Sequence, residues 1–247
     1  MVAADTSRSR AYLQALARNQ LLPNFVFILA DVPGKSMPGQ VGRTAGDRPT
    51  VTADEPGDEW SETRFDPTEP IRVTLDKARI PYQTLAEADI NAVSVVDALR
   101  SRAESVFIYS GYGGVLLRSA VLGCGKRFLH AHGGYLPDYK GSTANYYSLI
   151  DDGTIGASAI FLSDRLDSGP ILRRRKFSPP KHRMAIDHIY DPGARAKVLI
   201  ETLGDYARTG TWTVESTNSG KGETYFIIHP VLKHIAILAG VENSTCE

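Results

Sequence analysis

The chain has 247 residues, of which 42% are hydrophobic and 23% charged, which is ample for a full globular core. Lysine plus arginine and aspartate plus glutamate each total 28, so net charge excludes a general attraction to nucleic acid or anionic membranes. Two cysteines, no apolar run of about 18 residues and no apolar leader exclude a disulfide framework and a membrane helix, and predict a cytoplasmic protein.

The first elements expected are a helix over residues 9–21 and a buried strand over 25–30. Apolar residues at helical spacing indicate the helix, and Pro23 ends it. Alternation of strands and helices would normally place a strand before that helix. Only residues 1–4 are available for it, so the first strand is expected to be short or missing.

Residues 31–65 are polar, rich in Gly, Pro, Asp and Glu, and without periodicity. They are predicted to form a long surface loop. An ordinary surface insertion is the favoured interpretation, and the alternative is a loop that covers a site.

The next elements expected are two helices, a strand and a third helix, over residues 68–78, 92–103, 105–109 and 115–121. The loop 110–114, Ser-Gly-Tyr-Gly-Gly, follows that strand directly. Ligands of open parallel sheets bind at the carboxyl ends of strands, and the glycines allow close approach to the backbone. The loop is not G-x-G-x-x-G and no acid follows at the expected distance, which argues against a dinucleotide site.

Two histidines, His130 and His132, are expected on one strand that begins near residue 126. Alternate residues of a strand face the same side, so both imidazoles can point into one site. A turn at Pro137, a helix over 144–150 and a strand over 157–162 follow. Asp167 lies in the loop beyond that strand, where a carboxylate can orient and charge-stabilise an imidazole.

These motifs resemble the formyltransferase family that uses 10-formyltetrahydrofolate, over residues 84–180. The family signature is Asn-x-His, Leu-Pro-x-Tyr-(Lys/Arg)-Gly, a helix, a Gly-x-(Ser/Thr) strand and Asp-x-Gly. The corresponding residues here are His130-x-His132, Leu136-Pro137-Asp138-Tyr139-Lys140-Gly141, Gly156-Ala157-Ser158 and Asp167-Ser168-Gly169. One position departs, because His130 stands where the family has asparagine.

The resemblance implies formyl transfer from 10-formyltetrahydrofolate to an amine, with His130, His132 and Asp167 as catalytic residues. His132 takes the role of the family's histidine, and Asp167 tunes it and relays protons. His130 must supply what the asparagine supplies, and an imidazole N–H can donate a hydrogen bond to the oxyanion of a tetrahedral intermediate. A misaimed His130 would give a feeble or inactive relative.

The resemblance also implies binding residues around this centre. Those expected to hold the folate are Tyr112, Gly113, Gly114, Val115, Leu116, Leu136, Leu162, Asp164, Arg165 and Leu166. Those expected on the acceptor side are Lys140, Gly141, Ser142, Asn145 and Tyr146. The acceptor expected is the amino group of a small metabolite, such as an amino sugar nucleotide or an amino acid.

The basic run 173–176 is interpreted as an exposed strand edge, with contact to phosphates or to the folate glutamate tail as the alternative. A turn over 178–183, a brief segment over 185–190 and a helix over 194–206 follow. His229 and His234 are five residues apart with no acidic partner at metal spacing, so no metal site is expected. The oligomer expected, if any, is a homodimer.

The fold predicted is a three-layer α/β sandwich around a mostly parallel twisted sheet. Residues 1–180 are expected to form the catalytic domain, and residues 181–247 a C-terminal extension packed on it. Two further functions stay open: a hydrolase of the same fold that releases formate from 10-formyltetrahydrofolate, and a non-catalytic relative that binds folate or nucleotide.

Overall fold

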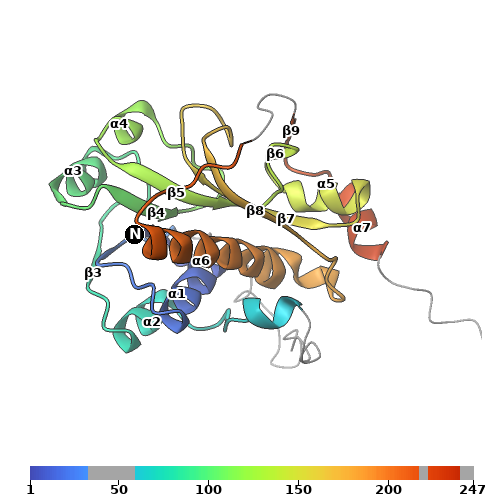
Figure 1. The fold of residues 1–247 in the computed structure, drawn as a ribbon, viewed down its shortest axis with the longest axis horizontal. Coiled ribbons are helices and arrows are strands. Elements are labelled where there is room, and N and C mark those ends of the chain that lie inside the picture. Colours follow the sequence, from blue (N-terminus) through green and yellow to red (C-terminus); the bar gives the residue numbers. More distant parts are fainter. Residues whose placement is uncertain (33–58, 217–221, 240–247) are drawn as a thin grey trace, which may run out of the picture.

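The computed structural model describes residues 1–32, 59–216 and 222–239, and a seven-stranded sheet lies at their centre (Figure 1). The strand order is β3-β2-β1-β4-β5-β7-β8. The first five strands are parallel, and β7 and β8 run antiparallel at one edge. Their bounds are β1 Val2–Ala3, β2 Val26–Ile28, β3 Tyr82–Thr84, β4 Val106–Ser110, β5 Arg127–His132, β7 Ile155–Phe161 and β8 Ile171–Phe177.

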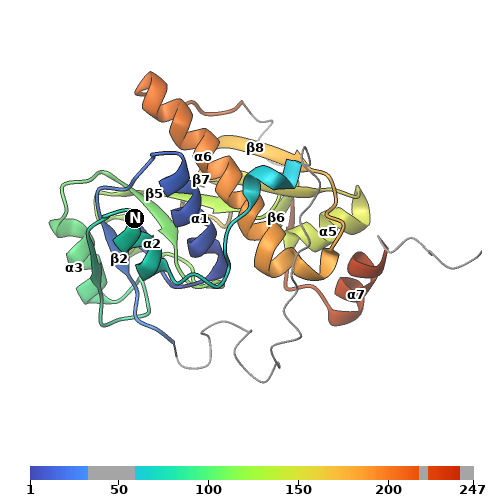
Figure 2. The same ribbon diagram turned by 90° about the horizontal axis from the view of Figure 1, so that it is seen from below.

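Helices cover both faces of this sheet (Figures 1 and 2). Helices α1 and α6 lie side by side across one face with α2 next to α1, and their apolar side chains share one buried cluster. Helices α3 and α4 pack on the opposite face around a second cluster. The predicted three-layer, mostly parallel sandwich is therefore confirmed. The bounds are α1 Ser7–Arg18, α2 Ile71–Lys77, α3 Val93–Ser101, α4 Ser119–Leu122, α5 Ala144–Asp151, α6 Asp191–Thr209 and α7 Pro230–Leu238.

The first strand is a two-residue stub, as the sequence suggests, yet it lies inside the sheet. Val2 and Ala3 pair with β2 on one side and β4 on the other, and both are fully buried. The helix that follows begins two residues earlier than predicted, because the Thr6 side chain caps it by accepting from the Ser9 amide. This compact start brings α1 to the carboxyl end of β4.

The structure corrects the prediction for the segment that follows β4 and adds one strand. The helix expected over 115–121 is reduced to the four residues of α4. The Asn91 side chain donates to the Leu116 carbonyl and accepts from the Arg118 amide, so these backbone groups find partners without helical hydrogen bonds. In addition, the short strand β3 was not predicted from the sequence.

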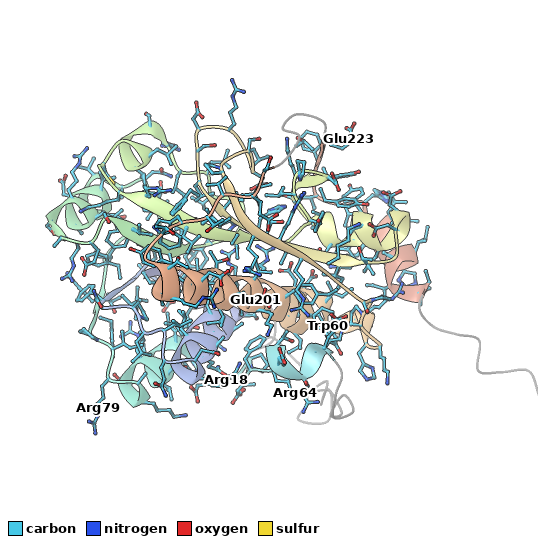
Figure 3. The ribbon with its side chains drawn as sticks, in the orientation of Figure 1. Arg18, Trp60, Arg64, Arg79, Glu201 and Glu223 are labelled. Carbon is cyan, nitrogen blue, oxygen red and sulfur yellow. The ribbon has the colours of Figure 1, made fainter. Side chains whose placement is uncertain are left out.

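Most of the predicted 31–65 loop, residues 33–58, lies outside the described residues. Its described end is not irregular, because Glu59–Thr63 form a 3₁₀ helix. Trp60 in this helix is 3% exposed and packs against Phe177 and Tyr190. This end of the segment is therefore anchored beside α6, where Figure 3 labels Trp60 and Glu201.

The C-terminal part of the chain contributes to the same core. Helix α6 buries Ala194, Val198 and Leu199 in the cluster shared with α1, and it follows a 3₁₀ turn and a π-helical turn over residues 183–190. A separate two-stranded sheet pairs β6, Tyr139–Gly141, with β9, Glu223–Tyr225. The domain boundary at residue 180 stays a prediction. No helix within the described ranges has the length and apolar character needed to span a bilayer.

Candidate active site

Strand β5 carries both predicted histidines at the edge between the parallel and antiparallel parts of the sheet. His130 lies opposite Ile160 of β7, and His132 lies opposite Ser158. The alternate residues of β5, Leu129 and Ala131, are fully buried in the cluster under α1 and α6. The period of two therefore directs both imidazoles to the other face, as predicted.

His132 is enclosed and makes contacts at both ring nitrogens. It is 4% exposed, and its Nε2 lies 2.9 Å from the carbonyl oxygen of Tyr139. Its Nδ1 lies 3.5 Å from Oδ2 of Asp167. Burial lowers the pKa of His132, and the carboxylate of Asp167 opposes that effect. The two residues that the resemblance pairs are thus neighbours in space, 35 residues apart in the chain.

Asp167 is directed to this position by its own backbone and by the turn that precedes α5. Its φ of 45° lies in the left-handed region, which asparagine and aspartate tolerate better than most residues. Its Oδ2 also accepts a hydrogen bond of 2.8 Å from the Gly141 amide. One carboxylate oxygen therefore links the β7–β8 loop to the predicted Leu-Pro-Asp-Tyr-Lys-Gly turn and to His132.

The segment after β5 is tightly clamped beneath the histidines. Ser158 donates to the Gly134 carbonyl at 2.8 Å and accepts from the Leu136 amide at 2.9 Å. A Cβ on Gly134 would lie 2.7 Å from His132 Nε2 and 2.5 Å from the Tyr139 carbonyl. Only glycine fits there, so the His132 ring and the turn close directly on this backbone.

A buried polar network from α6 supports the same segment and was missed from the sequence. Arg195 Nε lies 2.7 Å from Asp191 Oδ2, and Arg195 donates to the Ala131 carbonyl at 3.3 Å. Asn145 donates to Asp191 at 2.8 Å and accepts from the Gly156 amide at 2.8 Å. The one signal available was the spacing of four residues between Asp191 and Arg195, of which only Arg195 lay within the predicted helix 194–206.

A second arginine, Arg8 in the first turn of α1, lies at the carboxyl end of β4. Its Nε donates to Ser110 Oγ at 3.2 Å, and its guanidinium also contacts the Gly111 carbonyl. Burial and the charge of Arg195 lower the pKa of Arg8. Burial, followed by Arg8 and Arg195, lowers the pKa of His130 well below its usual value. The strand ends are thus a cationic environment in which an uncharged His130 is favoured.

The residues expected to hold the folate gather on two loops at these strand ends. Tyr112 is buried and donates to the Ala30 carbonyl at 3.0 Å, whereas Leu116 is 65% exposed. Val115 and Leu162 pack against the cluster under α3, and Leu162 also contacts the small cluster that contains Leu136. Gly113, Gly114, Asp164, Arg165 and Leu166 are exposed. Apolar side chains beside an open glycine loop fit a flat heterocycle, so these residues are compatible with a pterin ring.

The residues expected on the acceptor side divide into two groups. Lys140 and Gly141 are half-buried, and Ser142 is exposed. Asn145 and Tyr146 are buried, at 3% and 2% exposure. The amide of Asn145 is engaged with Asp191 and Gly156, so the structure gives it an internal role and no free surface toward a substrate.

The basic run lies on the edge strand β8, and each of its four side chains has a carboxylate partner. Arg173 pairs with Glu201 and Asp205, Arg174 with Glu215, Arg175 with Glu201 and Glu59, and Lys176 with Asp152. Glu201 lies on α6, close to the centre of the view in Figure 3. These pairs favour the structural interpretation of the run over a phosphate contact.

Within the described residues, no three His, Cys, Asp or Glu side chains are grouped to hold a metal ion. The arrangement instead offers an imidazole–carboxylate pair, a second imidazole on the same face and a loop open to a ligand. Such a set can move protons and stabilise charge at a reacting carbonyl.

Comparisons with known proteins agree with these motifs. The family model described as formyl transferase matches residues 2–184. A methionyl-tRNA formyltransferase from Desulfotalea psychrophila is 27% identical over 142 residues, which cover 54% of this chain and 42% of that protein. The matched part of this chain therefore spans less than half of that relative's length.

Solved structures share the fold at low identity. A sugar N-formyltransferase from a Shewanella species has a TM-score of 0.57 at 13% identity, covering 98% of this chain and 87% of that one. A phosphoribosylglycinamide formyltransferase from Bacillus halodurans has a TM-score of 0.52 at 16% identity, covering 85% and 95%. At these identities the likeness concerns the fold alone.

Proposed function

The chain belongs to the formyl transferase family, and from that premise we propose that it transfers a formyl group from 10-formyltetrahydrofolate to the amino group of a small metabolite. The observation that carries the proposal is the contact between His132 at the end of β5 and Asp167 in the β7–β8 loop, 3.5 Å apart. The family resemblance pairs the same two residues, which supports the proposal. Oδ2 of Asp167 contacts both His132 and the Gly141 amide, an arrangement that is not expected by chance at an unrelated strand end.

Acyl transfer to an amine requires two things of the site. The developing oxyanion needs a proton or hydrogen-bond donor, and the attacking nitrogen must lose a proton. Burial lowers the pKa of His132 and the Asp167 carboxylate at its Nδ1 opposes this, so the pair can take up a proton and deliver it on the donor side of this reaction. The segment 133–136, clamped by Ser158 and supported by Arg195, keeps that imidazole in place.

We assign the folate to the loops at the strand ends. Tyr112 to Leu116, Leu136, Leu162 and Asp164 to Leu166 would hold it, with the pterin against the apolar side chains and the glycine loop. When bound, the folate supplies the activated formyl group.

We assign the acceptor to the turn that carries Lys140, Gly141 and Ser142, which remain accessible beside Asp167. Two observations support a small molecule over tRNA. The formal net charge is zero, and the basic side chains of residues 173–176 all have carboxylate partners. An amino sugar nucleotide or an amino acid remains the acceptor class proposed, in a cytoplasmic enzyme.

The test measures formyl transfer from 10-formyltetrahydrofolate to a panel of amino sugar nucleotides and amino acids. Wild type is compared with Asp167→Asn, and with Asp97→Asn as a control, because Asp97 is an exposed carboxylate on α3. Asp167→Asn is expected to lower kcat/KM by about a hundredfold or more, since a positioned proton relay contributes on that order. Asp97→Asn is expected to match wild type.

The same assay separates the alternatives. Formate release that needs no amine would identify a hydrolase. Saturable folate binding without turnover of any kind would identify a non-catalytic relative. The absence of folate binding at millimolar concentration would contradict the proposal as a whole.

A further inference from the structure

His130 and His132 face the same side of β5, yet each is bonded through a different ring nitrogen. His130 has its Nδ1 3.2 Å from the Tyr109 carbonyl, at the end of the neighbouring strand β4. His132 has its Nε2 2.9 Å from the Tyr139 carbonyl. A carbonyl oxygen can only accept, so in each case the bonded nitrogen carries the proton and donates it.

This assignment leaves a different ring nitrogen free in each histidine: Nε2 in His130 and Nδ1 in His132. His132 Nδ1 faces the Asp167 carboxylate at 3.5 Å, a contact that is favourable when Nδ1 also carries a proton. His130 Nε2 has no hydrogen-bond partner within the described ranges, and the residue is half-buried. In the neutral ring, that free nitrogen presents a lone pair and no hydrogen.

Burial, and then the charges around His130, favour the neutral form of the ring. The groups that face it are Arg8 from α1, Arg195 from α6, His132 on its own strand and the Tyr109 carbonyl from β4. Two are permanent cations, and the Asp167 carboxylate lies against His132 instead. Burial and both arginines lower the pKa of His130, whereas the hydrogen bond to Tyr109 raises it by less.

We propose that His130 is the general base of the transfer and accepts the proton of the attacking amine at Nε2, while His132 and Asp167 act on the proton-donating side. This inference rests on the proposed formyl transfer. The amine nitrogen forms a bond to the formyl carbon, and its proton passes to His130. When the bond from that carbon to the folate nitrogen breaks, that nitrogen receives one proton from the side of His132 and Asp167. His130 then releases the amine proton to solvent and the His132–Asp167 pair takes one up from solvent, so the protein returns to its starting state.

The proposal reverses the role expected for His130 from the sequence, where it replaced asparagine as a donor to the oxyanion. An asparagine amide can donate a hydrogen bond but cannot take up a proton near neutral pH. The departure from the family motif would therefore be a change of function at this position. The variant His130→Asn restores the family's residue, but it should lose the base and with it the activity of this protein.

The first test needs no substrate. Histidine-selective ¹⁵N labelling reports which ring nitrogen is protonated, and His130→Gln assigns the signals. We expect His130 to be uncharged from pH 6 to pH 8, with a proton on Nδ1 and none on Nε2. An imidazolium at pH 7, or a proton on Nε2, would overturn the proposal regardless of which reaction the protein catalyses.

The second test uses the amine found in the transfer assay. His130→Asn is expected to lower kcat by a hundredfold or more, to remove the decline of kcat/KM at acid pH, and to leave folate affinity within about threefold of wild type. His132→Asn lowers kcat too, but should retain that acid limb. An active His130→Asn enzyme with an unchanged pH profile would refute the role of His130 alone. A wild type that transfers to no amine would refute the proposed function and, with it, this role.

Discussion

Among the arginine–carboxylate pairs of helix α6, one within the helix and one with strand β8 differ in burial. At its first turn, Arg195 and Asp191 are each 18% exposed and touch the backbone beneath the candidate site. Near its C-terminal end, Asp205 pairs with Arg173 of β8, and these side chains are 35% and 34% exposed. The same chemical pair therefore occurs once inside a polar network and once at an edge.

This difference in burial indicates which ion pair determines the geometry of the site. A buried ion loses its hydration, so removal of one partner leaves the other uncompensated. In an exposed ion pair each charge replaces hydrating water by its partner, so the pair adds little to the free energy of unfolding. Arg195 and Asp191 also leave no space for a side chain on Gly133, whose Cβ would collide with both. We therefore expect the polar network under β5, and not the ion pairs of β8, to determine the geometry of the histidines.

The largest expected effect tests this comparison directly. Asp191→Ala should lower the free energy of unfolding by about 3 kcal/mol, because Arg195, only 18% exposed, loses its carboxylate partner and Asn145 loses its acceptor. Urea denaturation measures the change, with Asp205→Ala as the matched control on the same helix. If the alanine variant does not fold, Asp191→Asn replaces it. Equal losses for Asp191 and Asp205 would contradict the comparison.

A glycine substitution sharpens the comparison without changing a charge. Gly134→Ala places a Cβ against His132 and the Tyr139 carbonyl, and should destabilise the protein by about 1–3 kcal/mol. Gly204→Ala is the control, because a Cβ there meets nothing within 4 Å and the residue lies inside α6. That control should stabilise by about 0.5–1 kcal/mol. Thermal unfolding of both variants measures these changes. A Gly134→Ala protein as stable as wild type would contradict the close packing of the turn on His132.

The sequence predicts the site best where local rules decide the geometry. The alternation of β5 and the composition of the 136–141 turn are local, and they place His130 and His132 on one face as predicted. The position of Asp167 after the returning strand suggested a carboxylate near an imidazole, and the family resemblance paired it with His132. No local rule fixes a contact between residues 35 positions apart.

Other features were missed because a distant partner decides them. The backbone at residues 115–118 is bonded by Asn91, a side chain on another segment, so helical spacing there was misleading. Strand β3 has only three residues, too few for a periodic pattern. Arg195 and Asp191 have the spacing of an ordinary exposed helix pair, and only the packing of α6 on β5 buries them.

The pH dependence of stability gives a smaller effect, centred on His130. Its pKa is lowered in the folded protein, so the unfolded chain binds more protons below its own pKa of about 6.5. The free energy of unfolding should therefore fall as pH drops below about 6.5, by at most about 1.4 kcal/mol per pH unit for this one group. His130→Gln should reduce that slope. His188→Gln, at an exposed position, serves as control, and equal slopes for all three proteins would exclude a neutral His130.

The smallest expected effect concerns the edge pair. A double-mutant cycle of Arg173→Ala and Asp205→Ala should give a coupling of about 0.2–1 kcal/mol, because both side chains are about one-third exposed and Arg173 can still contact Glu201. Because the Debye length is about 3 Å at 1 M salt, the coupling should shrink further there, whereas the cost of Asp191→Ala should persist. A salt-resistant coupling above about 2 kcal/mol would mean that β8 and α6 act as a second structural network, and that the basic run supports the site from the sheet edge.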